Sequence, residues 1–387
     1  MMKLFLLGFA LSLAALSSSA NELSQYTAGR VQKAHQLAEK EQFSQAIAIL
    51  KALDTSRGYE RAFVARMLGI FYWQNGQIQP AIKQLTLAVK SGQLKDEQAW
   101  QTQKMLADLL LNAQQFKQAL PHYYHLTKTT AKNQKADQVW LRIAQSHYQL
   151  KEWKKVLSAM ASYERFHLPD TQAPLSMTLS AQLELKKWRP AIGTIKRLID
   201  LQPNRTEWWR QLVALYLHVN DSSKALDTMA LAKLKGVPFD NSDHKLLAQL
   251  YAKRGIPERA AKELGEIVSI DSDRKLKAQQ ATYWQMAKEW QKSIASWRLA
   301  AKLDRQYNWH LAQLLVQEGQ YQSALAALDK VSGRKADVAL MKTRAYFKLQ
   351  KFDDALAYAK RSNEMAPSMQ AENWVKYLSQ LRQAKNQ

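Results

Sequence analysis

Small and apolar residues recur along this chain with the spacing of two short amphipathic helices joined by a tight turn. The stretch from Gly69 to Ala88 shows the unit most clearly. Gly69, the aromatic Tyr72 and the turn glycine Gly76 are followed by Ala81, which opens a second apolar stripe. Apolar positions three and four residues apart mark one face of a helix, and a glycine between two such stripes marks a turn. The pattern therefore predicts a helical hairpin.

The same unit repeats over most of the chain. Positions equivalent to Ala81 are separated by 31 to 38 residues and are Ala46, Ala81, Ala119, Val156, Ala191, Ala225, Ala260, Ser293, Ala324 and Ala355. A fixed period in this range is the signature of a repeat protein, in which each unit buries its apolar face against its neighbours. We therefore expect one long array of hairpins and no strands.

The repeat resembles the tetratricopeptide repeat. The resemblance covers about Glu22 to Gln387 and rests on the recurring order small, aromatic, Gly, aromatic, Ala, with Pro203 and Pro367 after two second helices. It implies an all-α, right-handed solenoid of about ten repeats. Ser368 to Lys385 is expected to form a final helix that covers the last hairpin. Proteins of this family are typically scaffolds that hold a peptide or a partner helix in the concave groove lined by the first helices.

The array is expected to have two parts. Gly236-Val237-Pro238 reads as a short linker. This places an N-terminal array of six repeats at 21–235, a C-terminal array of four repeats at 236–368, and the capping helix at 369–387.

The first twenty residues predict a secretory signal peptide. Lys3 precedes an apolar run from Leu4 to Leu16, and Ser18 and Ala20 stand at the −3 and −1 sites of a cut before Asn21. The run is too short to span a bilayer comfortably as a permanent anchor, which is the alternative. We therefore expect cleavage and a periplasmic protein. Proteins of this general kind, with a signal peptide and degenerate repeats, are found beside TonB-type energy-transduction systems and in envelope assembly, so the resemblance extends to a TonB-linked envelope complex.

The charge balance adds a second hypothesis. The 387 residues include 56 Lys plus Arg and 33 Asp plus Glu, a formal net charge of +23. Such a charge favours acidic partners and anionic surfaces. The expected periplasmic location argues against a nucleic acid as the binding partner. The main reading is thus a scaffold for an acidic protein segment, and the alternative is a cationic binder of an anionic envelope polymer or lipid surface.

The sequence offers no reaction chemistry. There is no cysteine, and no phosphate-binding glycine loop or hydrolase motif. His122 and His125 are spaced to share a metal, but no nearby carboxylate completes a site. We expect neither an enzyme nor a cofactor.

The candidate binding residues come from the repeat register. In this family the ligand-facing side chains lie at the fifth, sixth and ninth positions of the first helix, and cations and a histidine fill several of them: Arg66, Lys104, Arg142, Arg210, Lys245, His310 and Arg344. Charge-assisted hydrogen bonds from such a surface would hold a carboxylate-bearing segment. The alternative is that these helices simply carry solvated charged faces. Further cations surround Trp153 and Trp188, where a packed tryptophan among solvated lysines was the favoured interpretation over a membrane contact.

Overall fold

The structure is a computed structural model that describes residues 23–55, 58–129 and 135–385. These residues contain α-helices and short 3-10 turns and no strand. They form two compact units, Met1–Leu201 and Gln202–Gln387. The signal peptide predicted at 1–20 lies outside the described residues, and within them no helix is long and apolar enough to cross a membrane.

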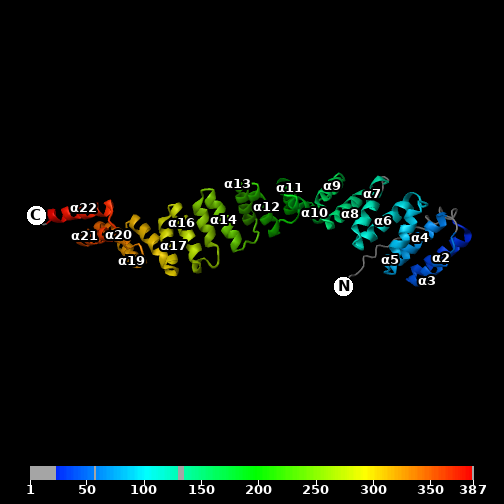
Figure 1. The fold of residues 1–387 in the computed structure, drawn as a ribbon, viewed down its shortest axis with the longest axis horizontal. Coiled ribbons are helices and arrows are strands. Elements are labelled where there is room, and N and C mark those ends of the chain that lie inside the picture. Colours follow the sequence, from blue (N-terminus) through cyan, green and yellow to red (C-terminus); the bar gives the residue numbers. More distant parts are fainter. Residues whose placement is uncertain (1–22, 56–57, 130–134, 386–387) are drawn as a thin grey trace. The chain divides into compact units, whose positions relative to one another are not determined.

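The first unit is a run of five hairpins, coloured blue to green in Figure 1. Each second helix packs against its own first helix and against the first helix of the next hairpin. The pairs are α2 (Gln25–Glu39) with α3 (Phe43–Lys51), α4 (Gly58–Gln74) with α5 (Ile78–Lys90), α6 (Asp96–Asn112) with α7 (Phe116–Lys128), α8 (Ala136–Gln149) with α9 (Trp153–Glu164), and α10 (Gln172–Glu184) with α11 (Trp188–Leu201).

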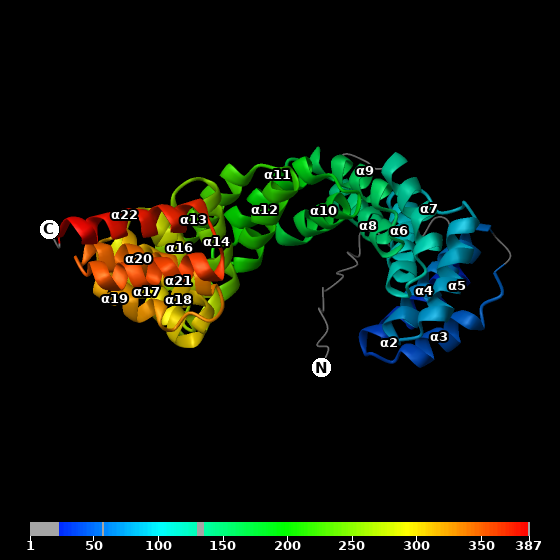
Figure 2. The ribbon, with the colours of Figure 1, turned by 60° about the vertical axis from the view of Figure 1, so that its left-hand side comes forward.

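The second unit continues the pattern with five more hairpins and a last helix, shown green to red in Figure 2. Its pairs are α12 (Thr206–His218) with α13 (Ser222–Leu234), α14 (Asn241–Lys253) with α15 (Pro257–Gly265), α16 (Arg274–Met286) with α17 (Trp290–Leu303), α18 (Asn308–Gln317) with α19 (Tyr321–Leu328), and α20 (Lys335–Lys348) with α21 (Phe352–Met365). Helix α22 (Met369–Lys385) packs on α21 and buries Leu378 there. The all-α array of ten hairpins and the C-terminal capping helix are confirmed.

The linker expected at Gly236 to Pro238 connects α13 to α14 inside the second unit. The two compact units meet between Leu201 and Gln202 instead, just before Pro203, which ends the fifth repeat. A functional boundary at residue 236 therefore stays a prediction.

The repeat register holds at every crossing of first and second helices. All ten side chains aligned with Ala81 are fully buried, with an exposed fraction of 0%. A small side chain at this position lets the two backbones approach closely. Ser293 is the one hydroxyl in the series, and it donates a hydrogen bond of 2.8 Å to the carbonyl of Ala281 on the facing helix. The buried hydroxyl that serine introduces at this position therefore has a hydrogen-bond partner inside the hairpin.

The ten hairpin turns share one backbone feature. In each, the residue five positions before the aligned small residue has a positive φ, between 55° and 79°. Glycine, which adopts this left-handed conformation without strain, occupies only three of the turns. The other seven use Glu41, Gln114, Lys151, Lys186, Asn220, Lys288 and Gln350. The absence of a turn glycine in the first repeat therefore does not change its turn.

Gly69 makes the closest approach among the glycines that the structure describes. A Cβ atom at this position would lie 2.6 Å from Cγ of Leu85 and 3.3 Å from the backbone nitrogen of Leu85 on α5. Leu85 is fully buried, so its side chain has no free space to move into. Only glycine allows α4 and α5 to pack this closely.

We expect Gly69→Ala to lower the free energy of unfolding by about 1–3 kcal/mol, because the added methyl overpacks the hairpin. The matched control is Gly193→Ala on the exposed side of α11, where a Cβ meets nothing within 4 Å. There the higher helix propensity of alanine should leave stability unchanged or raise it by about 0.5–1 kcal/mol. Thermal unfolding followed by circular dichroism measures both. Equal melting temperatures for the two variants would contradict the packing argument.

Candidate partner-binding face

First helices contact the first helix of the next hairpin at α2 with α4, α8 with α10 and α18 with α20. We call the side of each unit that the first helices line the first-helix face. All the predicted binding residues belong to first helices. Arg66, Lys104 and Arg142 lie in the first unit, and Arg210, Lys245, His310 and Arg344 lie in the second.

Two of the predicted cations in the first unit meet at a carboxylate of the chain itself. Nζ of Lys104 donates to Oδ2 of Asp108 over 2.6 Å, and Nε of Arg142 lies 4.0 Å from Oδ1. The hydroxyl of the buried Tyr123 also donates to Asp108 over 2.6 Å. Burial and this carboxylate raise the pKa of Tyr123. Asp108 thus pairs with two of the positive charges, on Lys104 and Arg142, that were expected to be available to a partner.

Arg66 differs because it is buried within α4. Only 5% of the residue is exposed, and this burial lowers the pKa of its guanidinium. Within the described residues it makes no hydrogen bond or ion pair. Its exposure is too small for the open contact that the sequence register suggested.

In the second unit, Arg210 is engaged by the start of a neighbouring first helix. It donates to both carboxylate oxygens of Asp243, over 2.9 and 2.6 Å, and to Asp240 over 2.6 Å. These two aspartates also form the capping box of α14. The hydrogen bond to Asp243 raises the pKa of Arg210. The arginine therefore joins α12 to α14, a structural contact of the array.

The remaining predicted residues stay accessible. Lys245 and Arg344 are half-buried and have no ion pair or hydrogen bond to the part of the chain that the structure describes. His310 is exposed, and its ring stacks on that of Trp297 with centroids 5.0 Å apart and an interplanar angle of 19°. Burial, followed by the charge of Arg334, lowers the pKa of His310. The neutral imidazole is therefore favoured at pH 7.

The first-helix face contains an open hollow in each unit. The first hollow, of about 600 Å³, lies over α6, α8 and α10 and is lined by amides, hydroxyls and aromatic rings, among them Gln145, Tyr148, Gln149, Ser176 and Ser180. The Oγ atom of Ser176 is buried and makes no hydrogen bond to the chain.

The second hollow, of about 680 Å³, lies over α16, α17 and α18. Its walls include Trp290, Trp297 and His310, and its polar groups include the side-chain amides of Gln279, Gln285 and Gln317. Neither hollow has a lysine or arginine among its lining residues. These two hollows are thus neutral, in contrast to the basic groove predicted from the sequence register.

Most of the hollow-lining residues were not identified from the sequence. Gln149, Met286 and Gln317 lie one helical turn beyond the positions that the register singled out, near the end of each first helix. Including the residue four positions after the ninth position of each first helix, which lies on the same helix face, would have identified these three residues.

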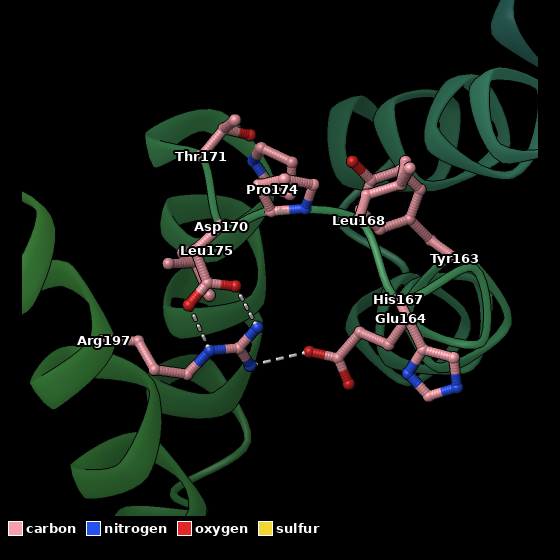
Figure 3. A pocket seen from close by; sticks show the side chains of 10 residues that line it. Tyr163, Glu164, His167, Leu168, Asp170, Thr171, Pro174, Leu175 and Arg197 are labelled. Carbon is pink, nitrogen blue, oxygen red and sulfur yellow. Dashed lines mark hydrogen bonds and ion pairs between the residues drawn. The ribbon is translucent and has the colours of Figure 1, made fainter.

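A smaller pocket of about 310 Å³ lies where the loop after α9 meets α11. Figure 3 shows Arg197 reaching across it to two carboxylates. Its Nε donates to Asp170 over 2.8 Å and its Nη1 donates to Glu164 over 2.9 Å. The hydrogen bond to Arg197 lowers the pKa of Asp170 and raises that of the arginine. The charges satisfy one another, so we interpret the pocket as a structural clamp of the loop.

One constellation has the geometry of a proton relay. The buried His147 donates from Nδ1 to Glu152 over 2.6 Å, and the hydroxyl of Tyr124 lies 2.8 Å from Nε2. Sequence spacing did not reveal it, because the three residues come from different parts of two hairpins. Only 2% of His147 is exposed, and burial raises the pKa of Tyr124, which keeps its hydroxyl protonated. The hydrogen bond between Tyr124 and His147 therefore joins α7 to α8, and the protonated hydroxyl of Tyr124 is not an activated nucleophile.

Among the described residues, no group of three or more His, Asp or Glu side chains could hold a metal ion. His122, one of the pair considered above, contacts the amide of Gln103 at 3.3 Å.

No family model and no curated protein matches this chain. Among solved structures, it is similar to the C-terminal part of a repeat-containing protein of the tetratricopeptide type from Cytophaga hutchinsonii, with 14% identity, 71% of this chain and 95% of that chain covered, and a TM-score of 0.36. A tetratricopeptide repeat protein from Parabacteroides merdae matches with 12% identity, 64% and 100% covered, and a TM-score of 0.32. MamA matches with 20% identity, 42% and 95% covered, and a TM-score of 0.32. The tetratricopeptide-type fold of this chain rests on its own helix pairs and period.

The second hollow should respond to acid through His310. Because its pKa in the folded protein is lowered, its contribution to stability is fully present above the unfolded value of about 6.5 and is lost as the pH falls through the folded value. We expect His310→Gln to reduce the fall in melting temperature between pH 8 and pH 5. Thermal unfolding of both proteins at the two pH values measures this. A parallel fall in parent and variant would contradict it.

Proposed function

We propose that the protein is a non-enzymatic interaction scaffold of the cell envelope that binds a protein segment along its first-helix face. The observation that carries the proposal is the pair of open hollows on that face. Their side-chain amides and hydroxyls suit the backbone of an extended segment, and their aromatic rings suit its apolar side chains. The packed small residues serve the array itself.

The proposal includes part of the charge prediction. Lys245 and Arg344 are the candidates for contact with acidic residues of the partner. Lys104, Arg142 and Arg210 are engaged with carboxylates of their own chain, as described above. We therefore propose a partner segment that is read mainly by neutral hydrogen-bonding groups and carries a few acidic side chains.

The setting that we propose is the periplasm, within an envelope complex such as a TonB-linked transport system. It is supported by the signal-like composition of residues 1–20 together with the degenerate repeats, a combination found in proteins of such systems.

Site-specific photo-cross-linking tests the binding face. A benzoylphenylalanine in place of Gln149 samples the first hollow, one in place of Gln317 samples the second, and one in place of Lys83, exposed on the second helix α5, is the control. Irradiation in living cells should give adducts with one defined protein from a hollow position and none from Lys83. The proposal fails if the Lys83 position gives the same adduct or if the hollow positions give none.

Export is tested separately. We expect the envelope fraction to contain a chain that begins at Asn21, because Ser18 and Ala20 suit the cutting enzyme. N-terminal sequencing and intact mass measure this. A chain that retains Met1 in the membrane fraction would show that the segment is an anchor instead.

A further inference from the structure

Free positive charge gathers on the hairpin turns of the first unit and not on its first-helix face. The turns that join α6 to α7, α8 to α9 and α10 to α11, together with the adjoining helix ends, contain seven cations and two carboxylates: Lys117, Lys151, Lys154, Lys155, Lys186, Lys187 and Arg189 with Glu152 and Glu184. All seven cations are exposed. Because successive hairpins stack side by side, their turns follow one another along one edge, which we call the basic edge.

Most of these cations lack a partner in their own chain. Lys155 is bound to Glu152 over 3.0 Å, but the structure gives no ion pair or hydrogen bond within its described residues to the other six side chains. This contrasts with Lys104 and Arg210 on the first-helix face, which are paired. The charge of the basic edge is therefore available to something outside the chain.

Three of the cations stand where folding disfavours them. Lys117, Lys154 and Arg189 each occupy the second residue of a second helix, in α7, α9 and α11. The N-terminus of a helix carries a partial positive charge, which favours acidic side chains and repels cations. None of these three helices has an acidic residue in its first turn. The cations thus do not serve the stability of the helices that bear them.

The equivalent positions in the other hairpins show that the array does not require a cation there. They are Ser44, Gln79, Ser223, Glu258, Gln291, Gln322 and Asp353. At the second residue of the second helix, a cation occurs only in three consecutive hairpins of the first unit. Each of these second helices packs on the first helix of the next hairpin, so the three turns follow one another and the row is a linear series of charges.

The aromatic residues between the cations are half-buried. Phe116, Trp153 and Trp188 begin the three second helices. Trp153 packs on Tyr148 with ring centroids 5.3 Å apart. With its rings half-buried, the edge offers limited apolar surface for insertion into a lipid interface. Its chemistry is a row of flexible cations, which matches repeated negative charge along a chain.

We propose that the basic edge binds a linear polyanion, a chain with repeated phosphate or carboxylate groups. The inference does not depend on the protein partner proposed above, since it uses a different part of the surface. Binding would be electrostatic, with release of counterions and a steep dependence on salt.

The test compares two triple variants that remove the same net charge. The edge variant is Lys117→Gln, Lys154→Gln and Arg189→Gln. The control is Lys33→Gln, Lys51→Gln and Lys83→Gln, three exposed lysines of the same unit outside these turns. The exported full-length chain is titrated with labelled polyphosphate, with polygalacturonate, and with vesicles containing anionic phosphatidylglycerol, each at several salt concentrations.

We expect the edge variant to bind one of the two polymers about tenfold more weakly, with the salt slope reduced by about 2, while the control keeps most of the parent's affinity. The responding polymer then shows whether phosphate or carboxylate is preferred. The edge variant should melt no lower than the parent, because the replaced cations opposed the helix dipoles.

Three outcomes would overturn the proposal. Equal losses in both variants would mean that only the total charge matters. Unchanged polymer binding in the edge variant would place any site elsewhere. Loss of vesicle binding alone would make the edge a membrane contact.

Discussion

The close approach of two helices at one small side chain is the constraint on which the whole array depends. At each of the ten crossings that side chain is fully buried, and at Gly69 even a methyl group would collide with Leu85. Because each hairpin buries its apolar faces against its neighbours, the packing repeats from one hairpin to the next within a unit. The repeat also determines what remains free for function, which is one face of first helices and one edge of turns.

These two free surfaces differ in charge. On the first-helix face, Asp108 forms an ion pair with Lys104, and Asp243 forms one with Arg210. The hollows there are lined by amides such as Gln145 and Gln317 and by aromatic rings. On the basic edge, Lys154 and Arg189 have no such carboxylate. A chain with a formal charge of +23 can therefore present neutral hollows on its binding face. Net charge alone does not say where an acidic partner would bind.

The fold could be predicted well from the sequence because packing at each hairpin crossing requires a small residue, which recurs along the chain at a nearly regular spacing. The spacing of Ala46, Ala81 and their equivalents gave the register, the number of hairpins and the capping helix. The candidate site was harder to predict, for a physical reason. Whether Arg210 is free depends on Asp240 and Asp243, which come from the next hairpin and have no fixed spacing in the repeat. The hollows likewise arise from three successive helices, so no single repeat contains their pattern.

Hydrogen exchange of backbone amides, with and without the partner identified by cross-linking, tests most directly whether the first-helix face is the binding surface. The account predicts slower exchange on binding in α8 and α10, around the first hollow, or in α16 and α18, around the second. Exchange in the second helices α9 and α19, which line neither hollow, should change little by comparison. Protection confined to second helices, or to the turns that bear Lys154 and Arg189, would contradict the account and move the partner to another surface.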